Sequence, residues 1–345
     1  MQKLVRLKKG KISCLLVLIL IIAGSVFFFL PDANRFCKQI DFEKKGRVPL
    51  ISDRPTYAAT HHNPRHKSKV IRLYGAHDLT IANQNIAGGR VSCIVLYNCY
   101  NIKILHNKLT SSSETGISLY GCYNIDIRFN YFANVSTGVY AVDIRRGRIV
   151  VNNNSFLNMQ GPYPRGQCVQ FDKVNGAGNE ICFNKCENIA GKSNPEDAIS
   201  LYKSNGTAES AIMVEGNRIR GGGPSKSGGG IMLGDSGGSY QIALKNILVD
   251  PGQYGIAISG GDRNAVVGNY IFGRPQRFTN VGIYVAGYNG AKCTNSTVEH
   301  NKVNYFNNQQ KPNHSWIGPN TSMPSGWETN IWGAPIGPDV FSKVK

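Results

Sequence analysis

The sequence is short of acidic residues: its 345 residues include 21 Asp and Glu against 39 Lys and Arg, and the formal net charge is +18. Methionines number only five and histidines seven, and the histidines are scattered, which disfavours metal delivery through those ligands. After residue 30 no useful length of chain has helical periodicity, so no helical domain is expected there. The glycine-rich segment 221–230 lacks the GKS or GKT spacing of a phosphate loop, which excludes a nucleotide site of that type.

One pattern recurs along the chain: an apolar residue, two spacers, an asparagine, one spacer and a second apolar residue. Gln84 takes the asparagine position in a variant copy, and the other copies carry Asn107, Asn130, Asn154, Asn184, Asn217, Asn246, Asn269 and Asn301. From Gln84 onward the spacings are 23, 23, 24, 30, 33, 29, 23 and 32 residues. A period of about 20–50 residues is typical of solenoids and other repeat arrays.

Each repeat contains two short apolar alternations, of the types Gly116–Tyr120 and Asn124–Arg128. A period of two places the apolar side chains on one face of a β-strand. A coil of this length cannot bury that face alone, so we expect coils to stack, with parallel strands and one continuous core.

The recurring asparagine has a physical explanation in such a stack. Asn tolerates the left-handed backbone region at a tight corner, and equivalent amides stacked at roughly 4.8 Å can bond to one another. The alternative, that asparagine is merely common in loops, does not account for eight asparagines in one register.

The repeat resembles that of the right-handed parallel β-helix, or pectate-lyase-like, superfamily, and the resemblance covers roughly residues 70–305. It implies an all-β, right-handed parallel β-helix solenoid of about nine or ten coils. The superfamily includes polysaccharide lyases, glycoside hydrolases, epimerases, tailspikes, adhesins and metal-maturation proteins, so the resemblance implies a fold and no single activity. The clustered signatures of pectate lyases and polygalacturonases are absent from the sequence.

The N-terminal residues predict a membrane segment. Basic residues 1–11 precede the uncharged run Ser13–Leu30, which is long enough to span a bilayer, and the positive flank predicts a cytoplasmic N-terminus. A cleaved signal peptide is the alternative. The domains expected are a cytoplasmic tail (1–11), a transmembrane anchor or signal helix (12–30), a linker and N-terminal cap (31–69), the β-helix (70–305) and an irregular C-terminal tail or cap (306–345).

Both flanking segments have two interpretations. His61, His62 and His66 of the linker suggest a metal site, but a solvated loop is favoured because no carboxylate or cysteine completes the set. The tail contains all three tryptophans, which either fold over the last coils or offer flat platforms to sugar rings.

The basic charge is shared between these parts, because residues 1–50 contribute +7 and the remainder contributes +11. With the body outside the cytoplasm, we expect a monomeric, single-pass protein whose partner is an anionic polysaccharide. Nucleic acid is not expected in that compartment. Charge that serves only solubility is the alternative.

Nine cysteines are many for this composition, and an extracytoplasmic location permits disulfides. Cys99 and Cys122 occupy the same register in adjacent coils, so they form either a disulfide or a stack of two free thiols. Cys186 is expected to point into the core, and its spacing from Cys182 lacks the second half of a zinc site.

The spacing of the repeat widens between Asn154 and Asn246, which places long insertions in residues 157–240. Aligning the first strand of each coil there predicts three outward columns. They contain Asp143, Lys173, Lys203 and Asp235; Val142, Asp172, Tyr202 and Gly234; and Tyr140, Gln170, Ser200 and Met232. Alternating Asp and Lys also form salt-bridge ladders that merely solvate a surface, which is the alternative interpretation.

This polar strip is the candidate site. In a uronate lyase, Lys203 beside Lys173 would act as the base and Tyr202 as the proton donor, while Asp172 and Asp235 polarise the substrate or hold Ca²⁺. Substrate contacts are expected from Tyr120, Tyr140, Asp143, Arg165 and Gln170. A glycoside hydrolase would instead use two carboxylates, Asp172 with Asp197 or Asp235. The sequence therefore predicts an exported, membrane-anchored β-helix that binds or processes an anionic polysaccharide, with β-elimination favoured over hydrolysis. A structural or adhesive solenoid and a metal-delivery protein are the alternatives.

Overall fold

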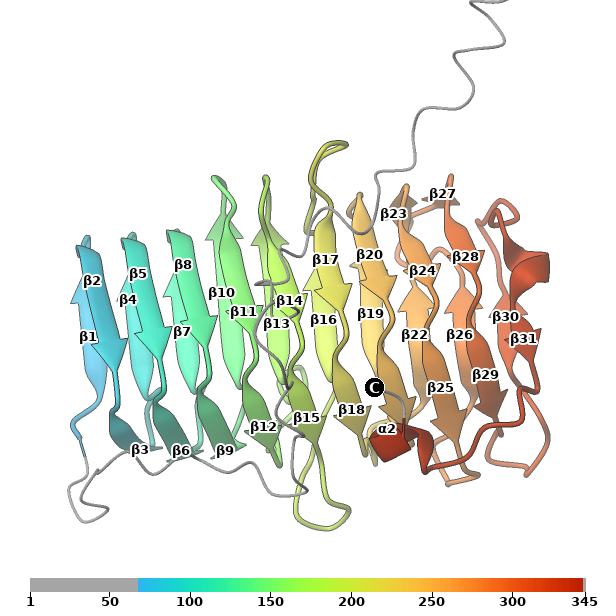
Figure 1. Ribbon diagram of the computed structural model, residues 1–345, viewed down its shortest axis with the longest axis horizontal. Helices are drawn as coiled ribbons and strands as arrows, with labels where there is room; N and C mark the ends of the chain where they lie inside the picture. Colours follow the sequence, from blue (N-terminus) through green and yellow to red (C-terminus); the bar gives the residue numbers. More distant parts are fainter. Residues whose placement is uncertain (1–67, 344–345) are drawn as a thin grey trace, which may run out of the picture. The chain divides into compact units, whose positions relative to one another are not determined.

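The computed structural model describes residues 68–343. These residues form a right-handed parallel β-solenoid of about ten turns, in which each strand pairs with its counterpart in the next coil. Figure 1 shows the coils following one another along the long axis, from β1 to β31. The predicted cytoplasmic tail, membrane segment and linker up to residue 67 lie outside the described residues, and so do the three linker histidines.

Three long sheets make the walls of the solenoid. The first sheet contains β1 (Ile71–Tyr74), β4 (Ile94–Tyr97), β7 (Ile117–Tyr120), β10 (Val139–Ile144), β13 (Val169–Val174), β16 (Ile199–Tyr202), β19 (Ile231–Asp235), β22 (Tyr254–Ile258), β26 (Val281–Val285) and β30 (Ser315–Ile317). The second contains β2 (His77–Ala82), β5 (Tyr100–Leu105), β8 (Tyr123–Arg128), β11 (Ile149–Asn152), β14 (Glu180–Cys182), β17 (Ile212–Glu215), β20 (Gln241–Leu244), β24 (Ala265–Val267) and β28 (Thr297–Glu299). The third contains β3 (Asn85–Gly89), β6 (Lys108–Ser112), β9 (Tyr131–Val135), β12 (Ser155–Leu157), β15 (Lys185–Glu187), β18 (Arg218–Arg220), β21 (Ile247–Val249), β25 (Tyr270–Gly273), β29 (Lys302–Tyr305) and β31 (Ile331–Trp332).

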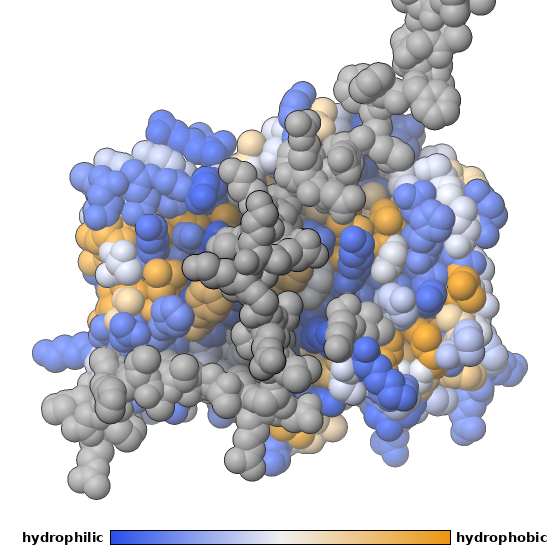
Figure 2. All heavy atoms as spheres, in the orientation of Figure 1, coloured by the Kyte–Doolittle hydropathy of each residue, from blue (hydrophilic) through white to orange (hydrophobic). Residues whose placement is uncertain are grey.

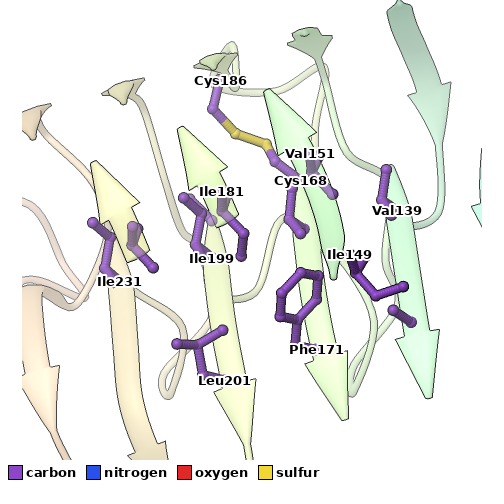
Figure 3. Close-up of a cluster of buried hydrophobic side chains, with 14 of the residues drawn as sticks. Val139, Ile149, Val151, Cys168, Phe171, Ile181, Cys186, Ile199, Leu201 and Ile231 are labelled. Carbon is purple, nitrogen blue, oxygen red and sulfur yellow. A yellow bond between two sulfur atoms is a disulfide. The ribbon is translucent and has the colours of Figure 1, made fainter. Parts of the chain in front are cut away.

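The core follows from the period of two within each strand. In β13, for example, Val169 and Phe171 point inward and are fully buried, whereas Gln170 between them points outward. Stacking of equivalent residues makes one continuous apolar core along the solenoid, part of which is drawn in Figure 3. In Figure 2, hydrophilic residues line the upper and lower edges of the described surface.

The repeated asparagines form a buried ladder at the corner between the second and third sheets. Each side-chain amide donates to the Oδ1 atom of the asparagine in the next coil at 2.8–3.1 Å, through Asn107, Asn130, Asn154, Asn184, Asn217, Asn246, Asn269, Asn301 and Asn330. Each amide also donates to a carbonyl of the preceding coil at 2.7–3.0 Å. Because each Oδ1 from Asn107 on also accepts a backbone N–H, the donors and acceptors of most of these amides are fully used.

The structure corrects one part of the explanation for the asparagines. The left-handed residue at this corner is not the ladder asparagine but the residue before it, for example His106, Phe129 and Phe183 with φ of 56–57°. The asparagine is therefore required for its hydrogen bonds to the neighbouring coils and not for its tolerance of positive φ.

The structure contains one disulfide, which the spacing did not predict, and decides between the two alternatives for Cys99 and Cys122. Cys168 and Cys186 form a disulfide with a Cα–Cα distance of 6.4 Å, which ties the first sheet to the third across the interior of one coil (Figure 3). Cys186 does point into the core, as predicted. Cys99 and Cys122 are buried free thiols, and each donates to a backbone carbonyl of the preceding coil.

The disulfide lies where residues that face each other across the interior are matched in size. The column that contains Cys168 is otherwise small: Gly116 faces the Phe132 ring, and Gly138 faces the Phe156 ring, with no room for a Cβ atom. In the next coil, Cys168 stands at the position of these glycines and Cys186 stands at the position of the phenylalanines.

The solenoid strands continue beyond Tyr305, where the repeat becomes hard to see in the sequence. β30 and β31 extend two sheets, and Asn330 extends the ladder after the short 3-10 helix η3 (Trp327–Thr329). Trp327 and Trp332 pack against the core, whereas Trp316 remains 43% exposed. The last element, α2 (Val340–Lys343), returns to cover Ile247, Val249 and Phe272 on the third sheet.

Two short strands, β23 (Gly261–Asp262) and β27 (Cys293–Thr294), pair with each other outside the three sheets. Among residues 68–343, none of the helices has the length and hydropathy needed to cross a membrane.

Candidate functional site

Three long connections lie at one corner, where the chain passes from the third sheet to the first. They comprise residues 158–168, 188–198 and 221–230, in the region where the widened spacing predicted insertions. The connections contact one another: Asn194 donates to the Met159 carbonyl at 2.9 Å, and the hydroxyls of Ser225 and Ser227 donate to Glu196. They border the outer face of β10, β13, β16 and β19.

One predicted outward column on this face has the predicted register. Tyr140, Gln170, Ser200 and Met232 are partners in successive strands. Tyr140 and Ser200 are nearly buried although they point outward. The polar side chains of this column are therefore held in a partly enclosed setting.

The second column was predicted correctly up to β16 and wrongly in β19. Asp172 pairs with Tyr202 as expected, but Tyr202 pairs with Asp235 and not with Gly234. An extra residue in β19 shifts the register at this point, and Gly234 adopts a left-handed φ of 63° there. The bulge moves Asp235 into the column of Asp172, two strands away.

The third column, with Asp143, Lys173 and Lys203, lies at the ends of the strands. All three residues have positive φ: 54° for Asp143, 55° for Lys173 and 46° for Lys203. The Lys173 Nζ atom is 3.7 Å from Asp143 and 3.9 Å from Asp172. These contacts are the beginning of the salt-bridge ladder that was the alternative interpretation of the charged column.

The surroundings of the two lysines differ. Lys173 Nζ lies near the carboxylates of Asp143 and Asp172, whereas Lys203 Nζ lies 5.2 Å from the centre of the Tyr202 ring. Lys203 is exposed. The assignment of Lys203 as a lyase base stays a prediction.

Arg165, Tyr140, Gln170 and Asp172 form a connected polar cluster. The Arg165 guanidinium lies 3.8 Å from the centre of the Tyr140 ring and donates to Gln170 at 2.6 Å. The Tyr140 hydroxyl donates to Asp172 Oδ2 at 2.8 Å. Burial raises the pKa of Tyr140, so the hydroxyl keeps its proton and acts as a donor.

The second carboxylate oxygen of Asp172 is the most unusual atom on this face. Asp172 Oδ1 is buried, yet it has no hydrogen-bond partner within residues 68–343. Lys173 Nζ lies 3.9 Å from this oxygen, which is beyond hydrogen-bond distance. A buried oxygen of this kind is costly unless a ligand or substrate supplies a donor.

Two further carboxyls on this face have raised pKa values. Burial raises the pKa of Asp235, and the negative charge of Asp172 adds to the effect. Burial raises the pKa of Asp197 to about 7, against a hydrogen bond from the Tyr254 hydroxyl. Asp197 is enclosed beneath the connections, and Gly229 N donates to it at 3.0 Å, so its position is structural.

Tyr120 lies at the edge of this face. Its ring stacks on Tyr97, which stacks on Tyr74, with centroids 4.7 and 4.8 Å apart, and it meets Tyr140 edge to face at 6.4 Å. Because the rings stack on one another, Tyr97 and Tyr120 offer hydroxyl edges and not open faces to a ligand.

The described residues contain no group of three or more His, Cys, Asp and Glu side chains arranged to hold a metal ion. The pair Asp172 and Asp235 alone does not make the Ca²⁺ site that was considered from the sequence, since Ca²⁺ takes six to eight oxygen ligands.

The model of one protein family, described as the right-handed beta helix region, matches residues 69–222 and 197–313. The chain belongs to this family. No curated protein matches the chain. The right-handed β-helix family fixes the scaffold on which the cluster is built, and its members' reactions differ, so the chemistry has to be argued from the side chains themselves.

Two residues of this β-helix that contribute to the site were not singled out from the sequence. Tyr254 holds Asp197, and Glu196 anchors the glycine-rich connection. Both act across coils, over 57 and 29 residues of sequence; Tyr254 begins β22, outside the four strands that were aligned, and Glu196 lies in a connection. To identify these two residues, one would have to know which insertions lie against one another, and the sequence does not show this.

Proposed function

We propose that this β-helix binds an anionic polysaccharide along the outer face of β10, β13, β16 and β19, and cleaves it with Asp172 and Asp235. The observation that carries the proposal is the buried, unpartnered Oδ1 atom of Asp172 in a cluster walled by insertions. A sugar hydroxyl or an attacking water would supply the missing donor.

Hydrolysis is the reaction that these two carboxyls support best. Asp235, with its raised pKa, is suited to protonate a leaving oxygen, and Asp172 Oδ1 is suited to accept a proton from water. The two residues are two strand spacings apart, roughly 10 Å at the backbone. Inverting glycosidases place their carboxyls about 6.5–9.5 Å apart and retaining ones about 5 Å, so inversion is expected.

The positive charge around the face supports an anionic substrate. Arg145, Arg146 and Arg148 are exposed in the turn after β10. The Arg146 guanidinium lies 5.0 Å over the Tyr123 ring. Together with Arg165 and Lys203 they make a basic border that would attract acidic sugars.

β-Elimination is a second candidate, and one contact favours it. Arg165 lies on Tyr140, next to Gln170, so a uronate carboxylate could pair with the guanidinium while the tyrosine exchanges a proton. In this scheme the substrate would have to displace Arg165 from Gln170.

The full-length protein incubated with alginate, pectate, hyaluronan and heparin tests both candidates. Hydrolysis releases reducing ends without ultraviolet absorbance, whereas elimination produces an absorbing unsaturated product. We expect Asp172→Asn and Asp235→Asn to lower turnover at least about 100-fold while binding persists, because a general acid or base contributes that much. Asp339→Asn, which changes an exposed carboxyl just before α2, is the matched control. Turnover unchanged in both site variants would overturn the assignment.

We further infer that the solenoid acts outside the cytoplasm, anchored through Ser13–Leu30. The Cys168–Cys186 disulfide supports this inference, because such bonds persist mainly in oxidising compartments. Protease added to intact cells should digest the solenoid, and recovery of the full chain in the soluble cytoplasmic fraction would contradict the inference.

A further inference from the structure

A concave surface lies on the same corner, further along the solenoid than the Asp172 cluster. It is a depression of about 420 Å³ lined by Pro224, Lys226, Gln276, Arg277 and Phe278. Its two walls are the glycine-rich connection 221–230 and the connection 274–280, between β25 and β26. The coil between them has only residues 250–253 at this corner, and the short connection leaves the gap.

Both walls of the depression are fixed by hydrogen bonds. Gln253 Nε2 donates to the Lys226 carbonyl at 2.6 Å, which holds the first wall. In the second wall, Gln276 N and Thr279 Oγ1 are 2.9 Å apart, and Thr279 is almost fully buried. The depression is therefore formed before any ligand arrives.

The two walls meet at Phe278. A Cβ atom on Gly223 would lie 2.2 Å from this ring, so only glycine lets the connection rest on it. Gly223 has a φ of 75°, which glycine also tolerates best. The partly exposed Phe278 ring and the exposed Pro224 give the depression an apolar surface, and apolar ring faces of this kind pack on sugar rings.

The charge of the depression is positive and uncompensated. Lys226 and Arg277 are exposed, and neither has an acidic partner among residues 68–343. Arg274, in the same wall, shows the contrast: it is paired with the buried carboxylate of Asp250. Lys226 and Arg277 therefore differ from Arg274, whose charge is paired with a carboxylate of the protein.

We propose that this depression is a subsite for a carboxylated sugar unit, in which the sugar packs on Phe278 and Pro224 and its carboxylate lies between Lys226 and Arg277. The proposal rests on the proposed function in taking the ligand to be a polysaccharide. It adds a binding position at the far side of the glycine-rich connection from the Asp172 cluster.

Isothermal titration of the full-length protein with an oligogalacturonate and with its methyl ester tests the proposal. The ester keeps the sugar rings and removes the carboxylates. We expect the acid to bind and the ester to bind at least about tenfold more weakly, because the ester loses the charged partner of Lys226 and Arg277. Lys226→Ala and Arg277→Ala should each weaken binding of the acid by about tenfold and leave the ester unaffected. Lys192→Ala, an exposed lysine on the neighbouring connection, is the control.

The outcomes separate this subsite from the proposed function. Binding that is weakened by Arg165→Ala but not by Lys226→Ala or Arg277→Ala overturns the subsite and leaves the proposed function standing. Binding weakened at Lys226 and Arg277 but unaffected at Arg165 and Lys203 supports the subsite and counts against the proposed face. Equal binding of the acid and the ester, or no binding of either, overturns the subsite.

Discussion

Two corners of the solenoid follow opposite rules. At the corner between the second and third sheets, every coil from Asn107 to Asn330 carries the same buried side chain, and each amide from Asn107 to Asn301 is bonded to both neighbouring coils. At the corner between the third and first sheets, the connections range from the three residues between β9 and β10 to the long segment 158–168.

The difference comes from where the polar groups find their partners. A buried ladder amide is satisfied by the amide and backbone groups of the neighbouring coils, so a change of length or residue there leaves unpaired donors and acceptors. The insertions lie at the surface, where water satisfies what the protein does not. Variation in length and sequence, and with it the candidate site, is therefore concentrated at the corner between the third and first sheets.

The largest effect is expected from breaking the ladder. Asn217→Ala removes bonds of 2.8–3.0 Å to Ile181, Asn184 and Asn246 and leaves their groups unpaired in the core. We expect the free energy of unfolding to fall by about 4 kcal/mol, as several unsatisfied groups cost about 1–3 kcal/mol each. Chemical denaturation measures this. Asn313→Ala, which removes only exposed bonds to Asn280, should cost under about 1 kcal/mol, and an equal loss would contradict the comparison.

Next in size is the covalent tie within one coil. Replacing Cys168 and Cys186 by alanine should lower the free energy of unfolding by about 3 kcal/mol, given the 18-residue separation. Alanine at Cys99 and Cys122, which are unbonded, is the matched double variant. Thermal unfolding under non-reducing conditions should show the first pair less stable than the second. Reduction of the wild-type protein should lower its stability to that of the Cys168 and Cys186 variant, and not to that of the Cys99 and Cys122 variant.

A smaller effect concerns Asp197, whose pKa of about 7 in the folded protein exceeds the ordinary value of 3.8. Below pH 4 the group is protonated in both states and its full stabilisation is present, and this is lost as the pH rises from about 4 to 7. Asp197→Asn mimics the neutral acid. We expect it to remove this decline and to be about 2 kcal/mol more stable than wild type at pH 8. Urea denaturation at pH 5 and pH 8 measures it, with the exposed Asp143→Asn as control. If the wild type became more stable from pH 5 to pH 8 relative to Asp197→Asn, the result would contradict this prediction.

The smallest effect is expected at the insertion corner itself. Ser227→Ala removes one bond to Glu196 at the rim, and Ser225 still donates to the same carboxylate. The free energy of unfolding should change by less than about 1 kcal/mol, because neighbouring donors and water replace the bond. A loss as large as that of Asn217→Ala would remove the distinction between the two corners.

The fold was predictable because its determinant repeats within the sequence. The asparagine pattern even continues at Trp327–Trp332, where Asn330 joins the ladder, although tryptophans in place of aliphatic residues hid it. On the first sheet, Tyr140 and Gln170 were placed correctly because strand register carries from coil to coil.

What failed depends on geometry that no local pattern records. Asp235 was misplaced because one extra residue at Gly234 is invisible to an alignment by alternation. The Cys168–Cys186 bond crosses the interior between two sheets, whereas the spacing directed attention to residues stacked along one sheet. The enclosure of Asp197 requires insertions from separate coils to be folded over it, and their paths are not periodic.

The amide ladder also determines how a chain of this kind can grow or shrink. Each asparagine presents the same acceptor to the coil before it and the same donor to the coil after it, so every rung is interchangeable with every other. Removing residues 108–130 would bring Asn107 directly below Asn154 and close the ladder again without an unmatched group. The natural unit of change is therefore one whole turn, and gene segments encoding single turns can be duplicated or lost while the rest of the molecule keeps its hydrogen bonds.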